Sequence, residues 1–214
     1  MTKTKNILNW VLGLVISALG LCLSTKSGLG LSMIGACPYI LHKWLIDKYS
    51  WFTQGTAEYV FEALVLLVTC LAVRKFKPRF LLSFLTAVIV GYIIDGWLWL
   101  LGGNGIYASM PARVLSFAGG MVVTALGVAF FFRTSLPLEV YELTVNEIHK
   151  KYGFSLKNTK LAFDGCMLLT AIVMALLLTH KLTGIGWGTV IITLCNSFII
   201  TFFGKIIDKI EGLN

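Results

Sequence analysis

Long apolar runs without charge alternate with short polar segments along the whole chain. These runs lie near residues 7–24, 80–94, 114–132, 165–179 and 182–204. Each is close to the roughly 20 residues that a helix needs to cross a bilayer. A transmembrane barrel would instead show short segments of alternating hydrophobicity. The pattern therefore predicts an all-α integral membrane protein.

The same pattern predicts six spanning helices and two shorter ones. The spans are expected at about 6–24, 56–73, 80–101, 111–132, 160–179 and 184–208. Segments 31–47 and 136–150 carry apolar stripes but are too polar to be ordinary spans. Each of these two partial helices either re-enters the membrane or lies along its surface.

The second half of the chain begins as the first half does. GLVISALG at 13–20 is matched by GMVVTALG at 120–127, an offset of 107 residues. The same offset places HK at 42–43 on HK at 149–150. Near the ends of the halves, GYIID at 91–95 is matched by GKIID at 204–208.

Three crossings in each half is an odd number, so the second half enters the membrane from the opposite side. We therefore predict two inverted three-helix repeats, each with a partial helix, as many secondary transporters have. The first repeat is residues 1–107 and the second is residues 108–214, within one membrane domain.

Composition and charge agree with a membrane protein. The chain is 57% hydrophobic and 13% charged, with a mean hydropathy of +0.84, whereas soluble domains carry about twice that charged fraction. The net charge of +8 reflects Lys and Arg gathered in loops, so no nucleic-acid partner is expected. Lys3 and Lys5 precede an apolar run without a signal-peptide cleavage site, which favours a retained helix.

Loop charges predict the topology. RKFKPR at 74–79 and HKKYGFSLKNTK at 149–160 are the strongest basic loops, whereas the loop at 101–113 has one basic residue, Arg113. Because Lys and Arg collect in cytoplasmic loops, the first two loops should face the cytoplasm and the third should face outside. The assignment alternates correctly when both termini are cytoplasmic and the partial helices do not cross.

The partial helices hold the candidates for solute binding. In the second, Pro137 suits a first helical turn with Ser135 as its cap, and Glu139 and Glu142 then share one face beside Tyr141. Interrupted helices at matched positions are typical of transport sites. If the segment lies on the membrane surface, its acids are solvated and have no such role. The candidate substrate-binding residues are Glu139, Tyr141, Glu142, Pro137, Tyr39, Pro38 and His42.

Acidic side chains within the predicted spans are candidates for ion coupling. They are Glu62, Asp164 and Asp95. A charge at the bilayer centre costs about 2.5–3.5 kcal/mol, which favours a partner, a proton or a water-filled cavity. Positions near the membrane interface would explain these acids equally well.

Paired glycines predict close helix packing. Gly13 and Gly20 fall on one face of the first span, and Gly120 and Gly127 on one face of the fourth. Small residues let helix backbones approach one another in lipid. These faces serve either contact between the two helices or a homodimer.

The sequence offers no catalytic arrangement. The HExxH, GxSxG and P-loop motifs are absent, and the three histidines are scattered. The five cysteines have no ligand spacing, so reduced packing residues are expected. We therefore predict a protein that is not an enzyme, with no catalytic residue, no metal site and no cofactor.

Three stretches carry a resemblance to a known family. They are SGLGLSMIGACPYIL at 27–41, FTQGTAEY at 52–59 and LPLEVYEL at 136–143. In these stretches the chain resembles the YczE-like family of bacterial membrane proteins, which overlaps the YyaS and YitT names. The resemblance implies a bacterial plasma-membrane location, and transport is the usual presumption for a family whose function is largely unassigned.

The chain departs from that family at one point. Its members often have a proline closely followed by an acid in both halves. Here the second half keeps Pro137 with Glu139, but Gly30 and Ser32 stand at the matching positions of the first half. A symmetric site with two carboxylates is therefore not indicated.

The leading hypothesis is a small secondary transporter or permease. Its solute would bind where the two repeats meet, and the N-termini of the partial helices would hold an anionic or zwitterionic group. Two alternatives stay open: a substrate-binding membrane subunit of a multi-component transporter, and a non-transporting accessory or scaffold protein. The expected partners are the lipid bilayer and a small solute.

Overall fold

A computed structural model of the protein describes residues 3–103 and 105–211. Asn104 of the predicted outer loop, and residues 1–2 and 212–214 of the predicted cytoplasmic termini, lie outside this range. Over the described residues the chain is helical and contains no strand. The helices are α1 (Lys3–Ser27), α2 (Met33–Leu45), α3 (Gln54–Val73), α4 (Pro78–Leu100), α5 (Met110–Phe131), α6 (Val140–Tyr152), α7 (Leu156–Met174) and α8 (Trp187–Glu211).

Among the described residues, six stretches are long and apolar enough to cross a membrane, and they match the six predicted spans. They are α1, α3, α4, α5, most of α8, and α7 together with the π-helical turn η1 (Ala175–Thr179) that continues it. The partial helices are α2 and α6, of 13 residues each, or about 20 Å, which is shorter than the bilayer core. The chain is therefore a multi-pass membrane protein whose spans contact lipid.

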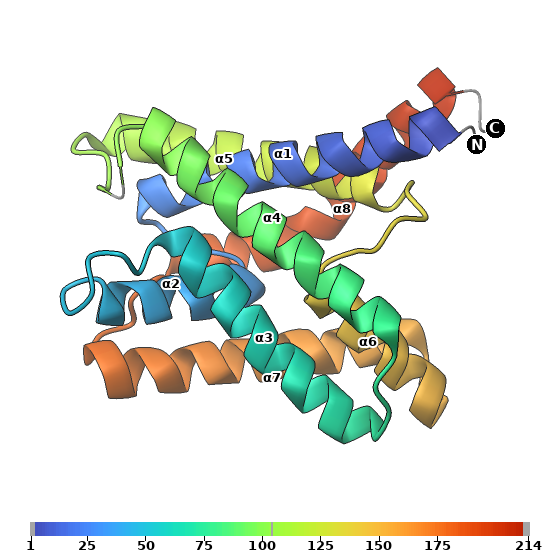
Figure 1. Cartoon of the computed structure of the whole chain (residues 1–214). Helices are drawn as coiled ribbons and strands as arrows, with labels where there is room; N and C mark the ends of the chain where they lie inside the picture. The colour runs from blue at the N-terminus through green and yellow to red at the C-terminus, as the bar shows by residue number, and fades with distance from the viewer. Residues whose placement is uncertain (1–2, 104, 212–214) are drawn as a thin grey trace. The chain divides into compact units, whose positions relative to one another are not determined.

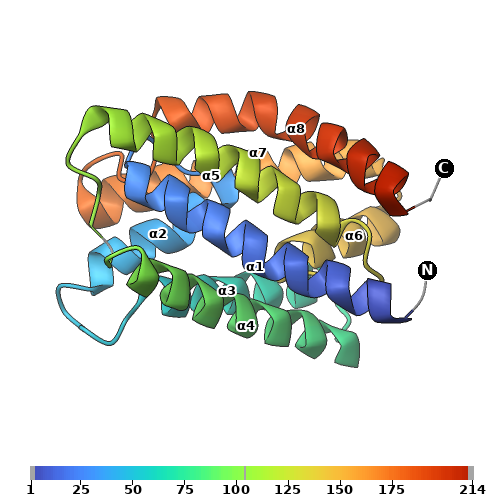
Figure 2. The same cartoon turned by 90° about the horizontal axis from the view of Figure 1, so that it is seen from above.

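The first of two compact units contains α1, α5, α8 and the end of α4. It consists of Met1–Ser32, Ile93–Leu136 and Gly184–Asn214. Within it, α1 lies antiparallel along α5, and α8 packs on α5 (Figures 1 and 2).

The predicted glycine faces form the contact between α1 and α5. A Cβ atom on Gly20 would lie 2.3 Å from the backbone nitrogen of Thr124, and one on Gly127 would lie 2.4 Å from that of Ser17. Gly13 and Gly120 are also buried in this contact. Only glycine permits this approach, so the predicted role in helix packing within the chain is confirmed. A homodimer through the same faces would have to displace α5 from α1.

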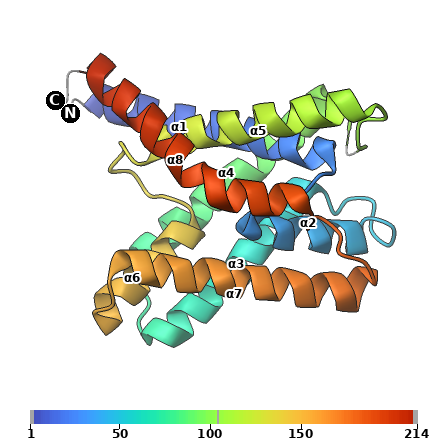
Figure 3. The ribbon, with the colours of Figure 1, turned by 180° about the vertical axis from the view of Figure 1, so that it is seen from behind.

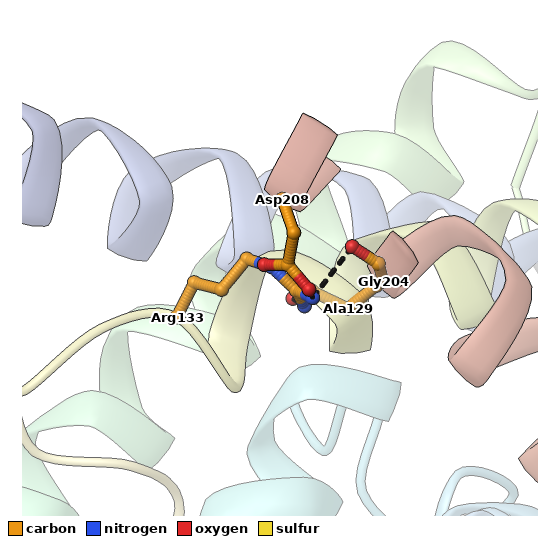
Figure 4. A network of polar contacts seen from close by, with 4 residues as sticks. All are labelled: Ala129, Arg133, Gly204 and Asp208. Atoms are coloured by element: carbon orange, nitrogen blue, oxygen red, sulfur yellow. Dashed lines mark hydrogen bonds and ion pairs between the residues drawn. The ribbon is translucent and has the colours of Figure 1, made fainter. Parts of the chain in front are cut away.

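Arg133, which follows α5, ties that helix to α8 (Figure 4). Its Nε and Nη2 donate to the two carboxylate oxygens of Asp208, each at 2.6 Å. The guanidinium also donates to the carbonyl oxygens of Gly204 and Ala129. The repeated GKIID motif at 204–208 thus supplies two of the residues that hold Arg133.

The second unit contains α2, α3, the start of α4, α6, α7 and η1. It consists of Met33–Tyr92 and Pro137–Thr183. Within it, α3 packs on α2 and α6, and α7 packs on the same two helices (Figure 3). A hydroxyl hydrogen bond of 2.7 Å joins Thr69 of α3 to Thr144 of α6. Apolar packing nearby involves Leu66, Phe80, Val140 and Leu143.

The start of α6 differs from the prediction. The helix begins at Val140 with Glu139 at its N-cap position, so Pro137 and Ser135 lie before it rather than in its first turn. Within the described chain, the Glu139 side chain makes no capping hydrogen bond. The hydroxyl of Thr86 on α4 donates to the carbonyl oxygen of Pro137 at 3.2 Å. This bond ties the non-helical segment before α6 to α4.

Candidate functional site

One face of α3 carries three large polar side chains that are buried. Gln54, Glu58 and Glu62 are spaced four residues apart and therefore share a face of the helix. They are only 1%, 4% and 0% exposed, respectively. The helix begins cleanly because the side chain of Thr53 accepts a hydrogen bond from the backbone of Thr56. This face is the core of the candidate site.

Two of these side chains hold the start of α6. Oε2 of Glu62 accepts a hydrogen bond from the backbone nitrogen of Val140 at 2.9 Å. Oε1 of Glu58 accepts one from the hydroxyl of Tyr141 at 3.2 Å. The first N–H groups of a helix have no partner within it, and a negative charge is favoured there by the helix dipole. Glu62 therefore caps α6 from a different helix.

Glu139 and Glu142 complete a group that we call the carboxylate cluster: Glu58, Glu62, Glu139 and Glu142. Glu62 interacts electrostatically with the other three. Glu139 is partly exposed, but desolvation by the surrounding protein still raises its pKa above the usual range, and the charges of Glu142 and Glu58 raise it further. Burial also raises the pKa of Glu142. The protonated forms of these two side chains are therefore favoured.

Several polar atoms on the α3 face have no protein partner. Within the described residues, Oε2 of Glu58, Oε1 of Glu62 and both amide atoms of Gln54 are buried and make no hydrogen bond. A buried polar atom left in this way costs about 1–3 kcal/mol. The face therefore has the unsatisfied hydrogen-bonding capacity of a binding site.

The neighbouring positive charge comes from α7. Lys160 lowers the pKa of Glu142, although burial outweighs this effect. Its Nζ lies 3.2 Å from a carboxylate oxygen of Asp164, and Asp164 also interacts with Glu142. The predicted Asp164 thus lies beside the carboxylate cluster, with its charge matched by Lys160.

Other predicted residues have local partners. On α2, Nδ1 of His42 lies 2.9 Å from the carbonyl oxygen of Phe52 in the connection to α3. The ring of Tyr39 has the ammonium group of Lys43 5.5 Å from its centre. Pro38 is buried inside α2.

From α2, the thiol of Cys37 interacts with Glu58 of the cluster. Burial raises the pKa of this thiol to about 12, and the charge of Glu58 adds to this effect. The thiol therefore stays protonated, and it donates to the carbonyl oxygen of Met167. Asp95 lies on the part of α4 that belongs to the first unit.

Sequence reasoning missed Gln54 and Glu58. The signal was present, because Gln54, Glu58 and Glu62 recur every four residues in a span that is otherwise largely apolar. The charge of Glu62 alone points to a single coupling residue, whereas the spacing of all three points to a polar face of the helix. Among the residues that the structure describes, no group of three or more His, Cys, Asp and Glu side chains is arranged to hold a metal ion.

Comparisons with known proteins place the chain in a family. A family model described as "Family of unknown function (DUF6198)" matches residues 4–205. "Uncharacterized protein YyaS" of Bacillus subtilis (strain 168) is 30% identical over 143 residues, which cover 65% of this chain and 68% of that protein. No solved structure matches the chain. The YyaS name agrees with part of the resemblance in the sequence, while the YczE and YitT names stay predictions. The chain therefore belongs to DUF6198, a family of unknown function.

Proposed function

We propose that the protein is a small secondary transporter or permease and that the carboxylate cluster is part of its solute site. The observation that carries this proposal is the meeting of four glutamates from α3 and the start of α6, two of them fully or almost fully buried. Ionisable side chains at membrane depth are costly and mark ion or substrate pathways. A purely structural role would not require carboxylate oxygens without partners.

The position of the cluster in the sequence supports a site where two repeats meet. Glu58 and Glu62 belong to residues 1–107, whereas Glu139 and Glu142 belong to residues 108–214. Each compact unit also takes matched elements from both halves: α1 with α5 in the first, and α2 and α3 with α6 and α7 in the second. Such pairing is what an inverted repeat would produce.

The charge at the start of α6 changes the expected solute. An anionic or zwitterionic group was expected at the N-terminus of a partial helix, but Glu62 already accepts the hydrogen bond from Val140 there. Glu139 and Glu142 add further carboxylates. A cationic or neutral solute therefore fits this site better than an anion.

A contact in the second unit supports the proposed topology in a bacterial plasma membrane. Glu147 of α6 forms ion pairs with Lys77 and Arg79. These pairs hold the basic loop 74–79 beside α6, which leads directly into the second basic loop, 149–160. Both loops would then face the cytoplasm together with the two termini.

The test is transport by purified protein in liposomes, with a panel of radiolabelled cationic, neutral and anionic metabolites and an imposed pH gradient. We expect the wild type to accumulate at least one solute. Glu62→Gln should reduce the uptake of that solute by about 10- to 100-fold. This is the effect expected when one charge-assisted hydrogen bond to the solute is lost. The variant keeps an oxygen that can accept from Val140, so its thermal stability should stay close to that of the wild type.

Glu147→Gln is the matched control. Glu147 is almost as buried as Glu62 but is paired with Lys77 and Arg79, so its replacement should lower stability and leave the KM for the solute unchanged. Normal uptake by Glu62→Gln would remove the cluster from the transport site. Folded protein that moves no solute, and that retains an ATPase module or an envelope assembly in mild detergent, would favour one of the two alternatives.

A further inference from the structure

We infer that the buried face of α3 formed by Gln54, Glu58 and Glu62 binds the protonated amine of a small organic cation, in competition with a proton. This inference names the class of solute for the proposed transporter. Its physiological meaning therefore rests on the proposed function. The binding itself can be measured without transport.

The unsatisfied atoms of this face define what it can bind. They comprise three acceptor oxygens, one each from Gln54, Glu58 and Glu62, and one donor, the amide nitrogen of Gln54. Successive side chains start about 6 Å apart along the helix. Acceptors predominate, so the ligand should present several N–H donors. An alkylammonium offers three and a guanidinium offers five.

The groups around the face favour a positive charge. From α6, Glu139 and Glu142 add carboxylates, and Tyr141 donates its hydroxyl to Glu58. From α2, the thiol of Cys37 is neutral. From α7, Lys160 acts on Glu142 but is also paired with Asp164. An anionic ligand would gain no charge compensation from these carboxyl groups, and a quaternary ammonium would leave the acceptor oxygens without donors.

Competition with a proton follows from the cost of a buried charge. A carboxylate on this face needs either a proton or a cationic partner, because an unpaired charge at membrane depth is unfavourable. When the amine cation binds, the carboxyl group gives up its proton to solvent and the carboxylate accepts N–H hydrogen bonds. One positive charge enters and one leaves, so the net charge of the site does not change.

The experiment uses the purified full chain in detergent with two probes, benzylamine and agmatine. Binding is followed by thermal unfolding and by proton release in weakly buffered solution with a pH indicator. We expect both probes to raise the melting temperature and to release protons. Because one proton leaves for each cation bound, the affinity should rise by about tenfold per pH unit while the carboxyl group is protonated. Tetramethylammonium and acetate should have no effect.

Variants assign the binding to the α3 face. Glu58→Gln and Glu62→Gln should each raise the dissociation constant of the probes by at least about tenfold and reduce proton release. Gln54→Leu should weaken binding without changing the number of protons released. Glu147→Gln should bind both probes as the wild type does, because its carboxylate is paired with Lys77 and Arg79.

Three results would overturn the inference: folded wild-type protein that binds neither probe, binding that is independent of pH, and equal binding of tetramethylammonium. The wild-type measurements decide this even if a variant fails to fold. Binding with proton release but no flux in liposomes would uphold the inference and remove the transport proposal. Flux that survives both glutamate substitutions, without amine binding, would remove the inference and leave transport standing.

Discussion

Two similarly buried glutamates of the second unit have opposite surroundings. Glu147 lies between Lys77 and Arg79, so its charge is compensated and it holds α6 to the connection between α3 and α4. Within the described chain, Glu62 accepts a hydrogen bond from the backbone nitrogen of Val140, and its charged neighbours are other carboxylates. The first arrangement stabilises the fold. The second lowers its stability, which is common where side chains are kept for function.

The carboxylate cluster predicts a dependence of stability on pH. The pKa of Glu139 is raised above its ordinary value of 4.5, so the folded protein keeps a proton that the unfolded chain loses. The associated stability is fully present below about pH 4.5 and is lost as the pH rises through the folded pKa. The melting temperature should therefore fall as the pH is raised above about 4.5. Glu139→Gln cannot ionise and should flatten this profile, as measured by thermal unfolding in detergent.

Thr69→Val is the control for that measurement. It removes the hydrogen bond to Thr144 and should lower stability by about 1 kcal/mol at every pH, because it adds and removes no ionisable group. A profile for Glu139→Gln as steep as that of the wild type would show that Glu139 does not hold the proton.

At the scale of single residues, the sequence predicts which side chains belong to the site better than it predicts how they are arranged. Glu62 was expected as a coupling residue, whereas Glu139, Tyr141 and Glu142 were expected as binding residues. Their meeting depends on how the start of α6 docks on α3, which no local pattern encodes. Ser135 was expected as the cap of this helix, but Glu139 takes the N-cap position, and the first backbone nitrogen of α6 donates to Glu62 of α3.

Among the helices, the spans were predicted to within a few residues, because apolar length is set directly by the thickness of the bilayer. The start of α6 was placed too early: Pro137 lies before the helix, and the helix start and the segment before it are held by tertiary contacts from Glu62 and Thr86 that no local pattern shows. The glycine faces were predicted from spacing alone, since small residues seven positions apart share one side of a helix. That the two faces meet each other within the chain, which was one of two readings, required the structure.

Adjacent glycines of α5 provide a test of the contact with α1. A Cβ atom on Gly120 would lie 2.6 Å from the Ser24 hydroxyl and 2.8 Å from the Gly20 carbonyl oxygen, whereas one on Gly119 meets nothing within 4 Å. Gly120→Ala should therefore lower the free energy of unfolding by roughly 1–3 kcal/mol. Gly119→Ala should leave it unchanged or raise it by up to about 1 kcal/mol. Equal effects of the two substitutions in thermal or denaturant unfolding would contradict this packing.

For the whole molecule, the compact units do not follow the order of the sequence. Each is assembled from separated stretches, and both include part of α4. Hydropathy predicts the number and length of the helices, but it does not encode which helices associate. The boundary between repeats near residue 107 stays a prediction, as does the orientation in the membrane, and both depend on the same crossing pattern.

That crossing pattern can be measured by labelling single cysteines in intact cells, after replacement of the five native cysteines. Lys75→Cys and Lys150→Cys lie at exposed positions in or beside the two basic loops, and Ala108→Cys lies at an exposed position in the loop between α4 and α5. Because basic loops stay in the cytoplasm, an impermeant maleimide should label Ala108→Cys and spare the other two. Permeabilised cells should label all three, which controls for reactivity.

The comparison of Lys75→Cys with Lys150→Cys is the stricter part of the test. Glu147 is paired with Lys77 and Arg79, so these two positions should lie on the same side of the membrane. If those two positions were labelled from opposite sides, an odd number of crossings would separate them, because either α4 or α5 would fail to cross or α6 would cross. At least one half would then have an even number of crossings, and the inverted repeat would have to be abandoned.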